Sequence, residues 1–346
     1  TTFALSGGDI EIRAGAFGGA AIVAPGATVT IASVASAGDV RLTGSGQVDA
    51  ESLNSFPTLG NVHLSGGSFV DVGDLDVWSG AGSIYIRSGE LHLSPAGLLS
   101  QSFADGDGGV VDIAVRGNLT AGTDTDTGII SVVLAGSYGG LGAGPAVKLD
   151  VGGTLDISDG SFILSESQGP GRAGNVDIRA GTVRVRGQGL GEFTGISAEN
   201  SGDGDGPSLR IATQSFEVLN GGFVGTRNVG PGTGGALSIQ ANRMLLTGTG
   251  GVTLSLSTET LGGDAGDLTI SAGSLELRDG ARISSSTGSF GNAGTIDVVA
   301  SEQITIAGDL SGIFSATVGF DADPAVGNAG DAGTLAVSTP LLLVQG

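Results

Sequence analysis

The stretch from Asp267 to Thr287, DLTISAGSLELRDGARISSST, contains three short segments in which apolar and polar residues alternate. The first two segments carry the apolar pairs Leu268/Ile270 and Leu275/Leu277. Alternation with a period of two is typical of β-strands that bury one side. The Ala-Gly and Asp-Gly steps between the segments are typical of tight turns. The stretch therefore predicts three strands joined by two corners, after which residues 288–294 return the chain.

The same unit recurs along the chain. Each recurrence begins with a glycine and a spacer, followed by an apolar-x-apolar pair, and successive pairs are separated by 22 to 39 residues. Repeats that cannot bury their apolar side alone do so by stacking on their neighbours. We therefore expect an all-β protein, a right-handed parallel β-helix with three short strands per coil and about 12 coils, forming a rod of roughly 58 Å. The twelve pairs are Ile10/Ile12, Val40/Leu42, Val62/Leu64, Ile84/Ile86, Val111/Ile113, Val147/Leu149, Val176/Ile178, Leu209/Ile211, Leu237/Ile239, Leu268/Ile270, Ile296/Val298 and Leu335/Val337.

The repeats leave no room for a linker, so residues 1–346 are expected to form a single β-helix domain. Residues 1–80 are predicted to form irregular coils and residues 81–346 more regular ones. Long insertions are expected in the return segment, at 124–144 and 318–333, because the other sides must keep stacking. The chain ends within what reads as a strand, which suggests a piece of a longer protein.

Composition excludes several classes of protein. The 67 glycines lack the three-residue period of collagen, and 39% hydrophobic residues are too many for a disordered chain. A net charge of −21 argues against binding to nucleic acid or to anionic lipid. Cysteine is absent, so neither disulfides nor thiolate metal sites can form. No apolar run approaches the roughly 18 residues of a membrane span.

Three phrases of the repeat carry a resemblance to a known family. They are GNAGTIDV at 291–298, GSLELRDGARISSST at 273–287, and RAGNVDIRAG at 172–181. The chain resembles the repeat, or shaft, region of filamentous-haemagglutinin-like exoproteins. The resemblance extends over most of the chain, with its clearest part between residues 145 and 300.

The resemblance implies export by two-partner secretion to the bacterial cell surface or the extracellular space. In that route an outer-membrane transporter recognises an N-terminal secretion domain that carries Asn-Pro-Asn-Gly-type motifs. This sequence contains no Asn-Pro pair, so the resemblance implies a shaft whose secretion domain lies upstream. The implied function is a structural and adhesive shaft in adhesion, aggregation or biofilm formation. Its possible partners are the transporter, a host or neighbouring cell surface, or a glycan, with no membrane insertion.

Asp-rich loops raise the possibility of bound Ca²⁺, which prefers oxygen ligands on flexible loops. None of the loops has the spacing of an EF-hand or the nine-residue period of a calcium-binding β-roll. Asp and Gly also dominate tight turns for conformational reasons, and we prefer that interpretation. No residue is therefore assigned to a metal or cofactor. The candidate loops are 105–109, with Asp105 and Asp107; 124–126, with Asp124 and Asp126; 203–206, with Asp203 and Asp205; 321–323, with Asp321 and Asp323; and 262–267.

The alternative function is a polysaccharide-active β-helix lyase or glycosidase, or a Ca²⁺-stabilised matrix protein. Glycosidases need two carboxyl groups across a groove, and the groove usually offers aromatic rings to the sugar. The carboxylate candidates are Asp71, Asp74 and Asp76, and the pair Asp150 and Asp156. We expect no catalysis, because aromatics are scarce and Lys148 lies in a plainly alternating strand. The remaining aromatic candidates are Trp78, Tyr85 and Tyr138, whereas Phe162, Phe216, Phe223 and Phe314 are expected to point inward.

Three further motifs are interpreted as structural. His63 and His92 occupy the middle of apolar-x-apolar segments, so both are expected to face outward without a catalytic or zinc role. The glycine-rich run 139–144 precedes a strand and lacks the Lys-Ser/Thr of a P-loop, which excludes a phosphate cradle. Ser and Thr at 255–258 and 284–287 do not repeat in one register, which argues against an ice-binding face.

Overall fold

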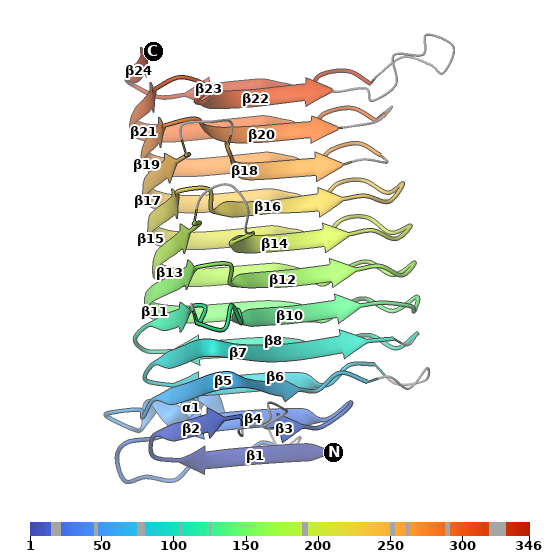
Figure 1. The fold of residues 1–346 in the computed structure, drawn as a ribbon, viewed down its shortest axis with the longest axis vertical. Coiled ribbons are helices and arrows are strands. Elements are labelled where there is room, and N and C mark those ends of the chain that lie inside the picture. Colours follow the sequence, from blue (N-terminus) through green and yellow to red (C-terminus); the bar gives the residue numbers. More distant parts are fainter. Residues whose placement is uncertain are drawn as a thin grey trace.

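The computed structural model describes residues 1–14, 22–44, 48–74, 80–103, 105–124, 126–188, 193–249, 253–260, 263–287, 291–317 and 330–346. The strands of this part of the chain belong to one 24-stranded sheet. The sheet winds around a single axis as a parallel β-solenoid, with the N-terminus at one end and the C-terminus at the other (Figure 1). In that view the front strands run left to right and the chain returns behind them as it climbs, so the coil is right-handed (Figure 1).

The solenoid has three faces, as predicted. Strands of the same face pair with their counterparts in the coils before and after. Several long strands bend at a corner and contribute to two faces. In the strand 146–158, for example, Val147 pairs with Val111 and Leu155 pairs with Leu119, and these two partners belong to separate strands on different faces. The faces are numbered here in the order in which the chain passes through them.

Face 1 consists of β1 (Thr2–Gly7), β4 (Thr28–Ser33), β6 (Ser83–Ser88), β8 (Val110–Val115), the first parts of β11 (Ala146–Ser158), β13 (Val176–Arg186), β15 (Leu209–Leu219), β17 (Leu237–Thr247), β19 (Leu268–Arg278) and β21 (Ile296–Ala307), and β23 (Leu335–Ser338). Face 2 consists of β2 (Ile10–Arg13), the starts of β5 (Val62–Asp71) and β7 (Leu91–Ser102), β9 (Leu119–Ala121), the second parts of the odd-numbered strands from β11 to β21, and β24 (Leu342–Gln345). Face 3 consists of β3 (Ile22–Val23), the ends of β5 and β7, β10 (Val132–Ser137), β12 (Phe162–Ser167), β14 (Gly195–Asn200), β16 (Phe223–Asn228), β18 (Thr253–Thr260), β20 (Ala281–Thr287) and β22 (Gly312–Thr317).

The solenoid makes about nine turns, which is fewer than the twelve coils predicted. This count follows from the ladder of face 3, in which nine turns of the chain connect ten successive rungs: Ile22, Val70, Leu98, Val133, Ile163, Ile196, Val224, Leu256, Ile283 and Ile313.

The predicted number was too high because one of the twelve apolar pairs belongs to no coil, and the last pair, Leu335/Val337, lies in a coil without a described strand on face 3. Ile10/Ile12 and Val62/Leu64 lie on face 2, whereas the pairs from Ile84/Ile86 onward lie on face 1. Val40/Leu42 lies in neither ladder, and Leu42 is 51% exposed and forms an antiparallel bridge with Val48. An alternating pattern shows that a segment buries one side, but it does not identify the face to which the segment belongs.

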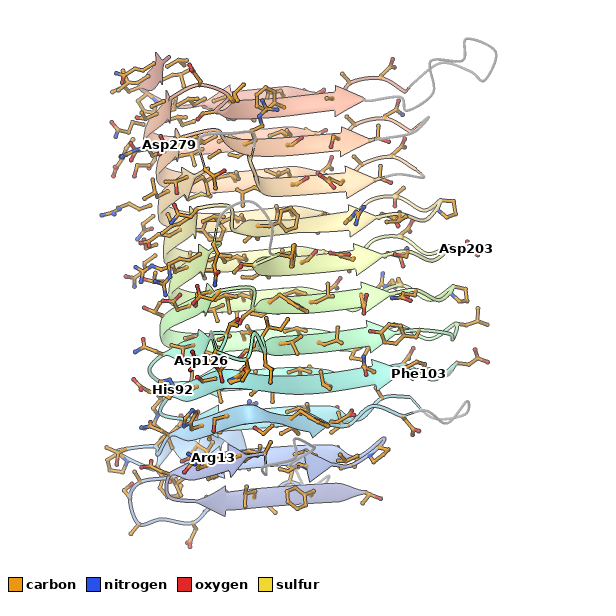
Figure 2. The ribbon with its side chains drawn as sticks, viewed as in Figure 1. Arg13, His92, Phe103, Asp126, Asp203 and Asp279 are labelled. Carbon is orange, nitrogen blue, oxygen red and sulfur yellow. The ribbon has the colours of Figure 1, made fainter. Side chains whose placement is uncertain are left out.

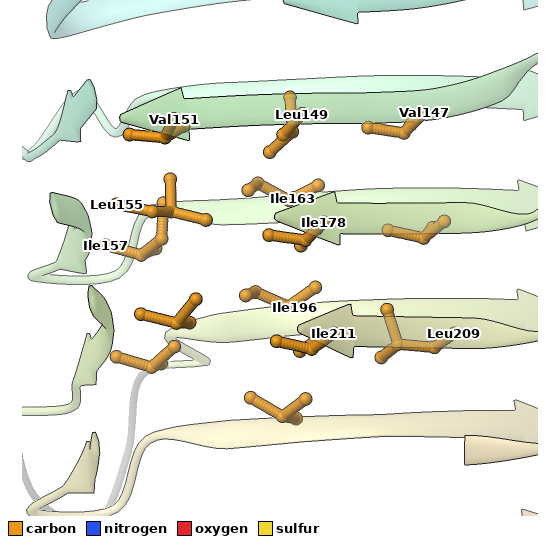
Figure 3. Close-up of a cluster of buried hydrophobic side chains, with 14 of the residues drawn as sticks. Val147, Leu149, Val151, Leu155, Ile157, Ile163, Ile178, Ile196, Leu209 and Ile211 are labelled. Atoms are coloured by element: carbon orange, nitrogen blue, oxygen red, sulfur yellow. The ribbon is translucent and has the colours of Figure 1, made fainter. Parts of the chain in front are cut away.

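The interior is one continuous apolar core that follows the axis. Its buried side chains run from Ile10 in β2 to Ile304 in β21. Figure 3 shows rows of aliphatic side chains from successive coils lying one above another inside the solenoid. The predicted core residues are confirmed, because each of them is at most 2% exposed; they are Ile178, Ile211, Ile239, Ile270 and Val298.

The corner between faces 2 and 3 is built on Asp-Gly or Asn-Gly pairs in three coils. Asp159, Asn220 and Asp279 have φ between 53° and 58°, and the glycine after each also has positive φ. Two consecutive residues with positive φ make a tight turn that Asn-Gly and Asp-Gly adopt at the least cost. The corner predicted at Asp279-Gly280 is therefore confirmed.

The corner between faces 3 and 1 has a polar interior. The hydroxyls of Ser165, Thr226 and Thr258 are buried and donate to carbonyl oxygens of the returning chain at 2.6–2.7 Å. Burying a hydroxyl costs free energy unless it is hydrogen-bonded, so these bonds help to hold the return segment against the sheet. The prediction that the serines and threonines at 255–258 and 284–287 do not repeat in one register is wrong, because Ser257 pairs with Ser284 and Thr258 with Ser285 in successive coils. These four side chains are buried, so they do not form an outward face.

The longest connection within the described part of the chain lies between faces 1 and 2, from 34 to 61, and carries the helix α1 (Ala50–Asn54). Leu53 and Phe56 bury themselves there in a small second cluster. The guanidinium of Arg116 donates to the carbonyl oxygens of Leu53 and Phe56, both at 2.8 Å, and so ties this insertion to the rod.

The predicted placement of an insertion at 124–144 is therefore wrong. The segment 124–144 is not a single return loop, because it contains β10, and the largest described insertion is at a different corner. Most of the predicted insertion at 318–333 lies outside the described residues. The sequence shows where apolar alternation stops. A short strand such as β10 has too few alternating residues to be distinguished from a loop by this pattern.

Three of the four phenylalanines expected inside point outward. Phe216 is fully buried, but Phe162 and Phe223 are only half-buried, and Phe314 is 37% exposed. Phe193 fits between Phe162 and Phe223, with ring centroids 6.1 Å and 5.6 Å away, and covers the glycine that separates them in the ladder. Rings that shield one another in this way can remain on the surface of a sheet.

Candidate functional site

The Asp-rich corner loops proposed for Ca²⁺ connect one coil to the next. The Oδ1 of Asp105 accepts the N–H of Leu141 at 3.1 Å, and the Oδ1 of Asp107 accepts the N–H of Ala143 at 3.0 Å. The same carboxylate position recurs at the neighbouring corner loops, where Asp264 accepts the N–H of Asn292 at 2.7 Å. These side chains therefore satisfy backbone groups of the following coil, at corners where the sheet ladder is interrupted.

Asp205 shows the electrostatic consequence of this arrangement. Its Oδ1 accepts both the hydroxyl of Thr233 at 2.7 Å and the N–H of Thr233 at 3.0 Å. These hydrogen bonds, the hydroxyl first, hold the pKa of Asp205 below its usual value of 3.8 because they favour the charged carboxylate. Asp203 is exposed at the tip of the same corner (Figure 2).

The loop at 124–126 is a local turn. The N–H groups of Asp126 and Thr127 donate to the Oδ1 of Asp124 at 2.9 and 3.3 Å, and the first of these bonds lowers the pKa of Asp124. Asp321 and Asp323 lie outside the described residues. Among the residues that the structure describes, no group of three or more His, Cys, Asp or Glu side chains could hold a metal ion.

The structure separates one of the carboxylate pairs considered for catalysis and places the other around one hollow. Asp150 and Asp156 belong to one strand, β11, rather than to adjacent strands, and lie on faces 1 and 2. Asp156 is instead bound by Arg186, whose Nη2 is 3.0 Å from both carboxylate oxygens. The structure therefore does not bring Asp150 and Asp156 together.

Asp71 and Asp74 line a hollow of 460 Å³ beside Gln101 and Phe103. The Oδ1 of Asp71 accepts the N–H of Gly73 at 2.8 Å, so this carboxylate also serves a local turn. The described lining contains no third carboxylate and no basic group. Asp76 and Trp78 lie outside the described residues.

The tyrosines serve as packing and hydrogen-bonding groups. Tyr138 stacks on Phe103 with ring centroids 5.0 Å apart, and its hydroxyl donates to the carboxylate of Glu166. Burial, together with that bond, raises the pKa of Tyr138. Tyr85 lies half-buried on face 1 near the guanidinium of Arg87.

Both histidines face outward, as predicted. His92 Nδ1 is 2.9 Å from the hydroxyl of Thr120, and His92 Nε2 is 3.1 Å from the carboxylate of Glu90 (Figure 2). His63 occupies the adjacent rung, with the two rings edge to face at 6.1 Å. The pair forms a short surface ladder.

The glycine run 139–144 forms part of a corner loop. A Cβ on Gly142 would lie 2.4 Å from the carbonyl oxygen of Gly106 in the preceding coil. The glycine is therefore required by the close approach of two coils.

A shallow groove of 660 Å³ lies along face 1. Sequence reasoning missed it. Its lining includes Asp112, Lys148, Asp177 and Arg210, which are the middle residues of four consecutive apolar-x-apolar pairs. Comparing those middle positions from unit to unit would have shown the alternating charge. The groove continues toward the α1 insertion, where Leu53, Arg87 and Arg116 line a second hollow of 380 Å³.

Comparisons with known protein families, with curated proteins and with solved structures gave no match. Within the described residues, no helix has the length and apolarity needed to cross a membrane.

Proposed function

We propose that this chain is a length of structural and adhesive shaft from a secreted bacterial surface exoprotein of the filamentous-haemagglutinin-like kind. The observation that carries the proposal is the unbroken stack. Within the described residues, one apolar core runs through the coils from β2 to β21, and side chains bridge successive coils at their corners. A rod built in this way holds a distal region at a fixed distance from its point of attachment.

The resemblance of the repeat phrases supports the rest of the proposal. The full-length protein would leave the cell through a two-partner transporter that recognises a domain other than this one, and the rod would stand at the cell surface. Its acidity supports this location, because a net charge of −21 keeps long rods apart and soluble.

A replacement experiment in the full-length protein tests the shaft role. Residues 1–346 are exchanged either for an unrelated β-solenoid with the same number of turns or for a flexible Gly/Ser linker. Adhesion of the bacteria should survive the first exchange and fall with the second, while the amount of secreted protein stays the same. Loss of adhesion with both exchanges would mean that the surface of this segment, rather than its stiffness, does the binding.

The enzymatic alternative has its own measurement. The purified chain is incubated with acidic and neutral polysaccharides, and new reducing ends and unsaturated sugars are quantified. Release of either product above that of a boiled sample would contradict a shaft without catalysis.

A further inference from the structure

Face 1 carries two rows of outward side chains with alternating charge. The first row reads Asp112, Lys148, Asp177 and Arg210 through β8, β11, β13 and β15. The second row lies two residues further along the strands. It carries Asp150 and Arg179 on β11 and β13, with alanines on the coils before and after. These six residues are called the charged patch.

Most of the patch is free to bind. Lys148, Asp150, Arg179 and Arg210 are exposed, and Asp177 is half-exposed. Within the described part of the chain, none of these five side chains makes a hydrogen bond or ion pair. Asp112 is engaged by Arg87, whose Nη1 lies 2.7 Å from its carboxylate. Neighbouring rungs of a parallel sheet lie about 4.8 Å apart, so the free charges form a close grid.

The grid has a symmetry that suits a second copy of itself. A two-fold axis that lies along the strand direction between β11 and β13 exchanges coils but keeps each row in place. It brings Lys148 opposite Asp177 of the other copy, and Asp112 opposite Arg210. In the second row it brings Asp150 opposite Arg179. All six charges therefore meet the opposite sign, and each pairing occurs twice.

The competing arrangement is less complementary. If two rods packed side by side in the same direction, Lys148 would face Asp150 and Asp177 would face Arg179, but Asp112 and Arg210 would each face an alanine. A polyanion would also fit poorly, because the patch contains three carboxylates and three cations. Charge complementarity thus favours an antiparallel second copy over either alternative.

We propose that the charged patch is a homotypic contact, through which two copies of this chain associate antiparallel along face 1. The shallow groove over the patch leaves room for water between the rods, as is common at polar interfaces. The association does not depend on the shaft function, because it follows from this surface alone. Between rods on neighbouring cells, an antiparallel contact would hold the cells together.

Sedimentation equilibrium of the purified chain at about 0.15 M salt tests the contact. The wild type should form a dimer, and Lys148→Glu should weaken it at least about tenfold, because two attractive pairs become repulsive. Arg243→Glu is the matched control, since Arg243 is exposed on face 2 and the change in net charge is the same. This control should dimerise nearly as the wild type does.

Mixing two variants separates a contact between chains from a stabilising role within one chain. Lys148→Glu and Asp177→Lys should each fail to dimerise alone, because each creates like-charge pairs. An equimolar mixture should regain the dimer, because the substituted residues face each other with opposite charge and the native residues do the same. Asp150→Lys with Arg179→Glu gives a second, independent pair for the same test.

The outcomes are distinct. A wild type that stays monomeric at the highest soluble concentration overturns the proposal, as does a Lys148→Glu variant that still dimerises. Failure of both mixtures to restore the dimer, with circular dichroism showing that all variants are folded, overturns the antiparallel pairing. If the alternating charges only stabilised the stack of coils within one chain, the variants would change the melting temperature and would not change the association of the chains.

Discussion

Truncating Ile270 should destabilise the solenoid far more than truncating its neighbour on the same strand. Ile270 is fully buried, and its rung neighbours Ile239 and Val298 are also buried. Ile270→Ala removes three carbons, worth about 2.4 kcal/mol at roughly 0.8 kcal/mol each. The sheet holds the adjacent rungs in place, so the site cannot collapse fully and a cavity term raises the loss to about 3–4 kcal/mol.

The matched control is Thr269→Ala, because Thr269 is exposed on the outer side of the same strand. It should change the free energy of unfolding by less than about 0.5 kcal/mol. Repeat proteins can unfold in parts, so urea titration by circular dichroism is combined with hydrogen exchange at the amides of Ile239 and Val298. Equal stabilities of the two variants would refute the assignment of Ile270 to the interior. Ile270→Asp, which buries an unpaired carboxylate, should be more damaging still.

Three further predictions concern the corners and the insertion. The pKa of Asp205 in the folded protein lies below its usual value, so this carboxylate contributes to stability above about pH 4, and the contribution is lost as the pH falls through the folded pKa. The melting temperature should therefore fall less on acidification in Asp205→Ala than in the wild type. Gly230→Ala would place a Cβ 1.7 Å from the carbonyl oxygen of Gly202 and should lower the melting temperature by several degrees, whereas Gly7→Ala, with no atom within 4 Å, should have little effect. Arg116→Ala removes three charged hydrogen bonds to the α1 insertion and should cost about 1–2 kcal/mol locally. Faster proteolysis within 34–61 at an unchanged melting temperature is the expected result, and unchanged proteolysis would show that the insertion is held by Phe56 and its cluster instead.

The sequence predicted the repeating architecture best where the coil is short. The strands expected within 267–287 are found as β19 and β20, with the Asp279-Gly280 corner between them. Alternation and Asp-Gly pairs are local signals, and they determine local structure. The α1 insertion was not predicted, because its contacts involve residues far away in the sequence, such as Arg116.

Predictions of which side chains on a strand point into the core were less successful. Phe162 and Phe223 lie next to the buried Ile163 and Val224, and an aromatic ring looks like a core residue in a sequence. Both point outward, because Phe193 shields them from a separate part of the chain. The charged patch was also missed, since its residues are unremarkable one by one and acquire a pattern only when the coils are in register.

The Asp and Asn side chains at the corners give the rod a direction along its axis, because their hydrogen bonds run the same way from coil to coil. In the bridges made by Asp107, Asp205 and Asp267, the oxygen belongs to the earlier coil and the N–H to the later one. Asn118 and Asn175 follow the same order. A chain that emerges N-terminus first thus presents, on each finished coil, acceptors positioned for amides that have yet to arrive. Growth of the fold from its N-terminal end would therefore place every new turn on a prepared template.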